Sequence, residues 1–293
     1  MKSIVILGAD GYIGRNLTHT FAKKYHVKTL AHENKNSLKG IRNVETFSGT
    51  ILKRDDLDRV IDYGDIVINL AGTTTLSIEE DRHFVLNVLA QQVVAQVCAE
   101  KGARVICFST SYIYSSGRRL SKESDAVQPE DAYSFSKKLG EEIYEFYSRS
   151  RNLPVVVFRL GSVYGPGHRK GVVFTMAESL MKSGIIEIPQ QRTVRDLIYI
   201  DDVALAVEKA IAYSKKGYHL FNITSGEAQA LEKLAGIICA LYGGGKIKRT
   251  GRKSSPAIIH ASIAHAEREL KFRPRTELSI GLRKTLASYK MDL

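Results

Sequence analysis

The fold is decided by the stretch Ser3-Ile-Val-Ile-Leu-Gly-Ala-Asp-Gly-Tyr-Ile-Gly-Arg-Asn-Leu17. Its apolar run, residues 4–7, is typical of a buried parallel strand, and a helical pattern follows the last glycine. Between them, Gly8, Gly11 and Gly14 predict a tight turn, a close approach of the backbone to a phosphate, and close packing of the helix on the strand. Strand, glycine turn and helix N-terminus in this order predict a site for the phosphates of a dinucleotide.

Other residues join this predicted cofactor site. Tyr12 and Ile13 lie between the second and third glycines. The fourth predicted strand, residues 66–70, ends in small residues that leave room for a cofactor. We therefore expect Leu70, Ala71 and Gly72 to line the cofactor site. Asn87, from the predicted helix 77–101, is expected to join them there. A lone asparagine inside a helix is more often structural than catalytic.

The end of the second predicted strand, residues 27–31, bears on the choice between NAD and NADP. In NAD-selective sites an acidic residue near this point binds the ribose 2′-hydroxyl, and Glu33 falls late for that role. His32 and Lys35 can instead face a 2′-phosphate, or be ordinary loop residues. The sequence therefore predicts NAD or NADP, with a preference for NADP.

Composition limits the class of protein. The chain has 293 residues, 44% of them hydrophobic, and a formal net charge of +12. The positive charge favours a solvated basic surface first, a site for an anionic small substrate second and a nucleic-acid partner last, because only residues 246–253 are densely basic. No apolar run predicts a membrane span or a signal peptide. Cys98, Cys107 and Cys239 lack metal-ligand spacing, so we expect reduced thiols in a cytoplasmic protein without a metal.

The remaining pattern alternates strands with helices, which predicts an α/β fold with a doubly wound parallel sheet. Helices are expected at 55–61, 77–101 and 133–151, strands at 103–108 and 155–160, and a turn at 161–167. We expect residues 1–165 to form the dinucleotide-binding Rossmann core, with 195–223 returning to it. Residues 166–194 and 224–293 are expected to form a smaller substrate-binding lobe.

The carboxyl-terminal part is predicted to be mostly helical. Helices are expected at 172–182, 228–241, 264–270 and 279–289, with a short strand at 220–223. Asp201 or Asp202 is positioned to cap a further helix that runs through Tyr213.

One pair of residues carries the expected chemistry. Tyr133 and Lys137 are four residues apart and therefore share one face of a helix. A lysine ammonium lowers the pKa of a neighbouring tyrosine, whose phenolate can then take a proton from a substrate alcohol while hydride leaves for the cofactor. Thr110, at the end of the fifth predicted strand, is placed to orient the substrate.

Together these motifs resemble the extended short-chain dehydrogenase/reductase family, the nucleotide-sugar epimerases and dehydratases. The resemblance covers nearly the whole chain. It rests on GADGYIG (8–14), NLAG (69–72), FSTSYIYS (108–115), YSFSK (133–137), FRLGSVYGPG (158–167), RDLIYIDDVA (195–204) and AERELKFRPRTELSIGLRKT (266–285).

The resemblance implies roles for particular residues. Thr110, Tyr133 and Lys137 match the catalytic hydroxyl, tyrosine and lysine, and Lys137 is expected to hold the nicotinamide ribose as well. Substrate contacts are expected from Thr110, Ser111, Ser162 and Arg195, with Arg195 on the diphosphate of a nucleotide sugar. Arg252 matches a second phosphate-binding arginine less well and is equally explained as a solvated loop charge.

The chain departs from the family at three informative places. Ser111 and Tyr112 replace the Asp-Glu pair that expels a hydroxyl in dehydratases, which argues against dehydration. Ser162 stands where an asparagine is common, and Thr50 where an aspartate contacts adenine. The chain is also short for an epimerase.

Several functions therefore stay open. The first is an epimerase that recycles bound NAD, and the second is an NADPH-dependent reductase of a keto nucleotide-sugar. A small-molecule carbonyl reductase and a non-catalytic dinucleotide-binding protein are further alternatives. The resemblance also implies a homodimer that pairs helices 77–101 and 131–151 across its interface.

Overall fold

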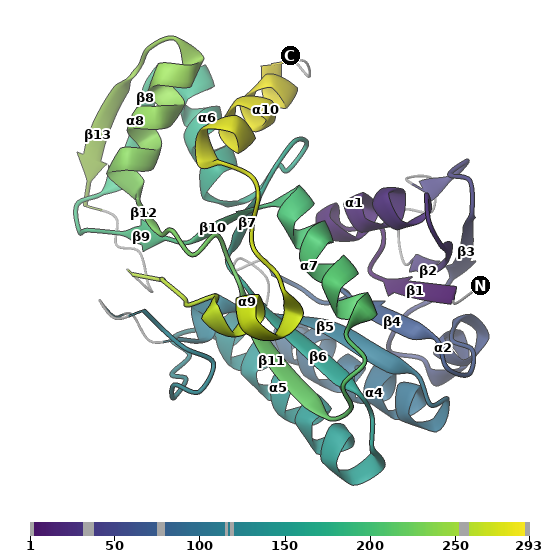
Figure 1. The fold of residues 1–293 in the computed structure, drawn as a ribbon. Coiled ribbons are helices and arrows are strands. Elements are labelled where there is room, and N and C mark those ends of the chain that lie inside the picture. The colour runs from purple at the N-terminus through teal and green to yellow at the C-terminus, as the bar shows by residue number, and fades with distance from the viewer. Residues whose placement is uncertain are drawn as a thin grey trace. The chain divides into compact units, whose positions relative to one another are not determined.

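The structure is a computed structural model that describes residues 3–31, 38–74, 80–114, 117, 120–251 and 258–290 (Figure 1). The chain divides into two compact units. The first comprises Met1–Ile113, Asp131–Arg159 and Val207–Phe221, and the second comprises Tyr114–Glu130, Leu160–Ala206 and Asn222–Leu293. Of the described helices, none combines the length and the apolar character that crossing a membrane requires.

The first unit is built on a seven-stranded sheet with the strand order β11-β6-β5-β4-β1-β2-β3. The strands are β1 (Ser3–Leu7), β2 (His26–Ala31), β3 (Val44–Ser48), β4 (Ile66–Asn69), β5 (Arg104–Thr110), β6 (Val155–Leu160) and β11 (Tyr218–Ile223). The pairs that join β3, β2, β1, β4 and β5 are all parallel. The chain adds β2 and β3 on one side of β1 and then crosses to β4 on the other. Ligands of open α/β sheets bind at such a switch point, and the predicted α/β fold class is confirmed.

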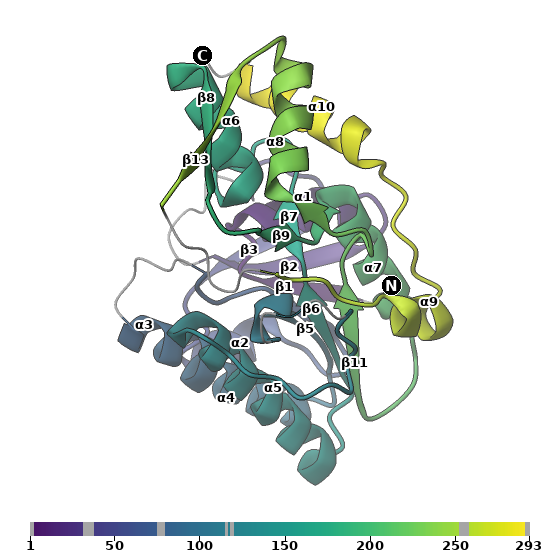
Figure 2. The same cartoon turned by 90° about the vertical axis from the view of Figure 1, so that its left-hand side faces the viewer.

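Helices cover both faces of this sheet, because its central strands are apolar on both sides. Ile4, Val5 and Ile6 of β1 are consecutive and fully buried. Figure 2 shows α2, α4 and α5 together on one face and α1 on the opposite face. These helices are α1 (Tyr12–Phe21), α2 (Arg54–Val60), α4 (Ala90–Glu100) and α5 (Ala132–Arg151).

The helix expected at 77–101 is interrupted. Its described part begins with α3 (Glu80–Phe84), widens into a π-helical segment (Val85–Leu89) and continues as α4. Such single π turns are frequent at functional sites. Apolar spacing did not reveal the π segment, because one extra residue in a single turn barely changes the pattern.

Helix α5 is fixed at its start and along its buried side. The Asp131 carboxylate accepts a hydrogen bond of 2.7 Å from the Ser134 backbone N–H, and the Ser134 hydroxyl lies 3.3 Å from the Asp131 backbone nitrogen. This capping box places Tyr133 in the first turn. Further along, Glu141 pairs with Arg159 of β6 through two buried contacts of 2.9 and 2.7 Å. Helix α5 is therefore held to the sheet near its middle.

The second unit contains short strands paired two by two. Parallel pairs join β10 (Leu197–Tyr199) to β7 (Ser162–Tyr164) and β13 (Lys246–Thr250) to β8 (Ile185–Pro189). An antiparallel pair joins β12 (Gln229–Ala230) to β9 (Val194–Arg195). Its helices are α6 (Gly171–Ser183), α8 (Leu231–Tyr242), α9 (Ala264–Leu270) and α10 (Leu278–Lys290), while α7 (Ile200–Ala212) lies partly in each unit.

Two expectations for this region were wrong. Residues 161–167 contain β7 rather than turns alone. Helix α7 begins at Ile200, so Asp201 and Asp202 lie inside its first turn. The Asp202 carboxylate instead accepts hydrogen bonds of 2.8 and 3.1 Å from the backbone of Arg275 and Thr276, which ties the carboxyl-terminal segment to α7.

Candidate active site

A cleft of about 500 Å³ lies at the carboxyl ends of the central strands of the first unit. It is lined by Gly8, Asp10, Gly11, Leu30, Gly49, Thr50, Ile51, Leu52, Leu70, Ala71, Gly72, Asp81, Arg82, Val85 and Leu86. Leu30 belongs to β2, and the other residues follow β1, β3 and β4 or belong to α3 and the π segment. The cleft is therefore lined by five residues that the sequence predicted for the cofactor: Gly8, Gly11, Leu70, Ala71 and Gly72.

Three glycines in or beside this cleft, Gly8, Gly14 and Gly72, have no room for a side chain. A Cβ on Gly8, which has φ +78°, would lie 2.7 Å from the Ala71 nitrogen, and one on Gly14 would lie 2.1 Å from the Gly8 oxygen. A Cβ on Gly72 would meet the Asn87 amide oxygen at 2.6 Å. Gly11 is exposed and makes the N-cap of α1, with no side chain occupying its first N–H groups. These features fit a bound dinucleotide, since α1 presents free N–H groups where a pyrophosphate binds.

Tyr133 stands beside the end of β5. The Thr110 side chain acts on its hydroxyl, and its ring lies 5.9 Å from the ring of His83, centroid to centroid. Desolvation by burial raises the pKa of Tyr133 to about 12, while the Thr110 hydrogen bond acts in the opposite direction. The order of the motifs in the sequence predicted that Tyr133 and Thr110 belong to one site. In the structure the two side chains interact.

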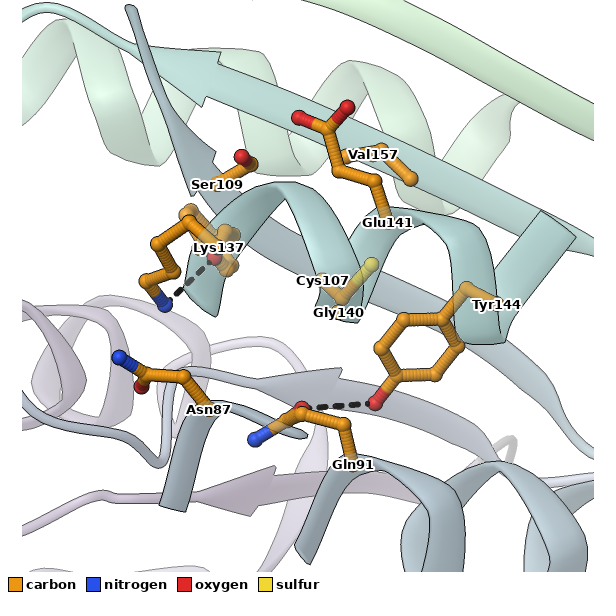
Figure 3. Close-up of a pocket in the computed structure, with 10 residues that line it drawn as sticks. Asn87, Gln91, Cys107, Ser109, Lys137, Gly140, Glu141, Tyr144 and Val157 are labelled. Atoms are coloured by element: carbon orange, nitrogen blue, oxygen red, sulfur yellow. Dashed lines mark hydrogen bonds between the residues drawn. The ribbon is translucent and has the colours of Figure 1, made fainter. Parts of the chain in front are cut away.

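Lys137 follows Tyr133 by one turn of α5. Its Nζ donates a hydrogen bond of 2.9 Å to the backbone oxygen of Phe108 (Figure 3). Burial lowers the pKa of Lys137 to about 8. The expectation that Lys137 lowers the pKa of Tyr133 stays a prediction: in this structure burial dominates the pKa of the tyrosine, and the ammonium binds a backbone carbonyl. Lys137 nevertheless lies close to Gly72, which lines the cleft. A Cβ atom added to Gly72 would be 3.5 Å from the Lys137 Nζ.

Asn87, in the π segment, joins three parts of the site. Its amide accepts a hydrogen bond of 3.0 Å from the Thr73 nitrogen and donates bonds of 3.1 Å to the Thr73 oxygen and 3.0 Å to the Ser136 hydroxyl. Its backbone oxygen lies against Gly140, where a Cβ would come within 2.8 Å. Asn87 thus fixes the loop after β4 against α5.

A second buried network supports the same loop. The Asn69 amide donates hydrogen bonds to the Gln91 carbonyl at 2.7 Å and to the Tyr144 hydroxyl at 2.8 Å. Gln91 in turn donates to the oxygens of Ala71 and Leu86 at 3.1 and 2.8 Å. A cavity of about 20 Å³, the size of one water molecule, lies among Asn87, Gln91, Lys137, Tyr144 and their neighbours (Figure 3).

Three buried polar atoms, on the neighbours of Thr110 and on His83, have no hydrogen-bond partner among the residues that the structure describes. They are the hydroxyl oxygens of Ser109 and Ser111, on either side of Thr110, and the Nδ1 of His83. Buried polar groups are nearly always paired, so such a cluster marks a place where a polar ligand is expected. Ser111 is one of the residues for which the sequence predicted a substrate contact.

The remaining predicted substrate residues belong to the second unit. Ser162 opens β7, and its N–H donates a bond of 2.8 Å to the Asp196 oxygen. Arg195 is buried in β9, with Nη1 donating to the Val194 oxygen at 2.8 Å. His32, Lys35 and Arg252 lie outside the described residues. Tyr12 and Ile13 begin α1 directly after Gly11.

Sequence reasoning missed three residues of the site. His83 lies four residues before Asn87 and Gln91 four residues after it, so helical spacing from Asn87 would have found both. Arg82 lines the cleft from α3, although its sequence neighbours give no sign of a ligand.

Comparisons with known proteins agree with this arrangement. The NAD dependent epimerase/dehydratase family matches residues 4–224. An uncharacterized UDP-glucose epimerase of Bacillus subtilis is 24% identical over 305 aligned residues, which cover 97% of this chain and 96% of the relative.

Solved structures share the fold. A UDP-glucuronic acid 4-epimerase of Bacillus cereus, in complex with UDP-glucuronic acid and NAD, superimposes with a TM-score of 0.89 at 23% identity, covering 99% of this chain and 100% of the other. A dTDP-glucose 4,6-dehydratase of Streptomyces venezuelae, with NAD bound, gives 0.91 at 21% identity over 99% and 97% of the two chains. The chain belongs to the NAD-dependent epimerase/dehydratase family.

Proposed function

We propose that the protein is an epimerase that uses NAD to invert one carbinol carbon of a nucleotide-activated sugar. One observation carries the proposal: the Thr110 side chain acts on the Tyr133 hydroxyl, while the Nζ of Lys137, one turn further along α5, lies close to Gly72, which lines the cleft. A proton-transfer group therefore stands next to the place where a dinucleotide fits. A protein that only binds a dinucleotide needs no proton-transfer group beside it.

The chain's own residues account for the proton. NAD, when bound, takes a hydride from the sugar carbon and returns it to the opposite face. Tyr133 Oη accepts the hydroxyl proton as the carbonyl forms and gives it back as the alcohol re-forms, so protons and electrons balance over the cycle. Thr110 orients the sugar oxygen. The Lys137 ammonium stabilises the negative charge that develops on Tyr133.

NAD rather than NADP is the cofactor we propose. Structural relatives were solved with NAD. The preference for NADP rested on His32 and Lys35, which lie outside the described residues, and nothing in the comparisons supports it. The proposal excludes dehydration for the reason given by the sequence: Ser111 and Tyr112 stand where an acid and a base are needed.

Substrate binding, assembly and location complete the proposal. Ser111, Ser162 and Arg195 are proposed to contact the substrate, with Arg195 on its diphosphate. A homodimer through α4 and α5 is proposed because Leu89, Phe135 and Phe146 are exposed apolar side chains on this helix pair and the segment before it. Three buried free cysteines favour the cytoplasm.

The decisive experiment combines cofactor analysis with turnover. The freshly purified protein is denatured, and released NAD and NADP are quantified. The native protein is then incubated with UDP-glucose, UDP-glucuronic acid or dTDP-glucose, without added cofactor, and epimers are followed by proton NMR. We expect nearly one NAD per chain and conversion of at least one sugar. An empty site together with stoichiometric consumption of NADPH by a keto sugar would instead establish a reductase.

A further inference from the structure

The cleft of the first unit has an uneven charge. Among the fifteen lining residues that belong to the described part of the chain, Asp10 and Asp81 are acidic and Arg82 is basic. A dinucleotide brings two further negative charges in its pyrophosphate. Unless a cation faces that group, two carboxylates and a diphosphate share one cleft, which is unfavourable.

Arg82 is placed to face it. It lies one turn before Val85 and Leu86, and it lines the same cleft as these two residues and as the loop of residues 70–72 that packs on Gly8. Its side chain is exposed, and no hydrogen bond or ion pair joins it to another residue within the described ranges. The guanidinium is therefore available, and its planar fork suits phosphate oxygens.

We infer that Arg82 binds the pyrophosphate of the dinucleotide, from the side of the cleft opposite the glycine turn. The turn at Gly8 and Gly11 provides backbone N–H groups and the positive end of the α1 dipole. Arg82 provides the full charge that the turn lacks. The inference rests on the proposed function, since it assigns one residue to the dinucleotide of that function.

The test uses Arg82→Gln, which removes the charge from an exposed side chain and leaves the fold intact. The cofactor-stripped protein is titrated with NADH, ADP and adenosine. We expect about tenfold weaker binding of NADH and of ADP, and unchanged binding of adenosine, because only the first two carry the diphosphate. Added salt should weaken ADP binding more in the wild type than in Arg82→Gln.

Two further variants sharpen the result. Arg42→Gln changes the net charge equally but lies before β3, at the end of the sheet opposite the cleft, and should leave all three affinities unchanged. Asp81→Asn removes a competing carboxylate and should strengthen NADH binding.

The outcomes separate the inference from the proposed function. Equal ADP affinity in the wild type and Arg82→Gln overturns the inference. Weaker NADH binding with unchanged ADP binding also overturns it, because Arg82 would then act on the nicotinamide half. A wild-type protein that binds no NADH contradicts the proposed function itself.

Discussion

Two groups of buried polar side chains, one in each unit, differ in how their polar atoms are paired. In the second unit, the Asn222 side chain is completely buried and fully paired: it accepts from the Tyr114 hydroxyl at 2.8 Å and donates to the backbone oxygens of Ser121 and Ser262 at 3.3 and 3.1 Å. In the first unit, Ser109, Ser111 and His83 are also buried but keep unpaired atoms beside Tyr133. The hydrogen bonds of Asn222 hold three segments of the chain together. The unpaired atoms of Ser109, Ser111 and His83 are expected to bind a polar ligand. Substitutions should therefore divide into those that cost stability and those that cost turnover.

The largest expected effect is on turnover. Tyr133→Phe removes the only group proposed to carry the proton, so kcat should fall about 1,000-fold. Its thermal midpoint and its affinity for NADH should stay close to those of the wild type, because the ring and its contact with His83 remain. Retained turnover would show that Tyr133 does not carry the proton. It would also weaken the argument that the unpaired polar groups near Tyr133 serve a ligand.

The next effect is on stability. Asn222→Ala leaves a hydroxyl and two carbonyls without partners, and should lower the free energy of unfolding by about 3 kcal/mol, measured by urea denaturation. Ser111→Ala is the matched control: it removes a buried hydroxyl that has no partner and should change the free energy by less than about 0.5 kcal/mol. If both variants lose stability equally, the distinction between paired and unpaired groups is wrong.

Lys137→Met should raise stability while it abolishes turnover. Burial holds the pKa of Lys137 at about 8, below its ordinary 10.5, so the unfolded chain binds more protons between these values. The burial penalty is fully present below pH 8 and disappears as the pH rises to 10.5. We expect the variant to be more stable by about 2 kcal/mol at pH 7, with the difference shrinking to nothing near pH 10.5. A difference independent of pH would contradict this account.

The smallest effect concerns the start of α5. Asp131→Ala removes the helix cap and should cost about 1 kcal/mol of stability. It should also lower kcat modestly, since Tyr133 lies two residues further on. Asp131→Asn keeps the capping hydrogen bond, so its stability and its kcat should both be close to those of the wild type. If this variant loses as much as Asp131→Ala, the charge of Asp131 matters rather than its capping bond.

Local patterns in the sequence predicted the first unit well. The helix 264–270 of the second unit was also placed at its observed bounds, and the strand 155–160 matches β6. The glycine turn, Tyr133, Lys137 and Thr110 were found because their spacing and order carry the chemistry. These features depend on neighbours a few residues away.

What the sequence did not show depends on distant partners. Strands β8 and β13 pair although about sixty residues separate them, and the exposed cations of β13 give no apolar pattern that would predict a strand. The role of Asp202 depends on a backbone more than seventy residues later. The pKa of Lys137 depends on how deeply α5 is buried, which no local pattern reports.

The π segment at Val85–Leu89 has a consequence for how this enzyme family can diversify. Its wider turn takes up one additional residue, which changes the direction in which the α3 side chains face relative to those of α4. The α4 surface that holds Gln91 against Tyr144 can stay constant while α3 presents a new set of side chains, such as Arg82, to the cleft. Insertions or deletions before Asn87 would then re-tune ligand preference without repacking the core.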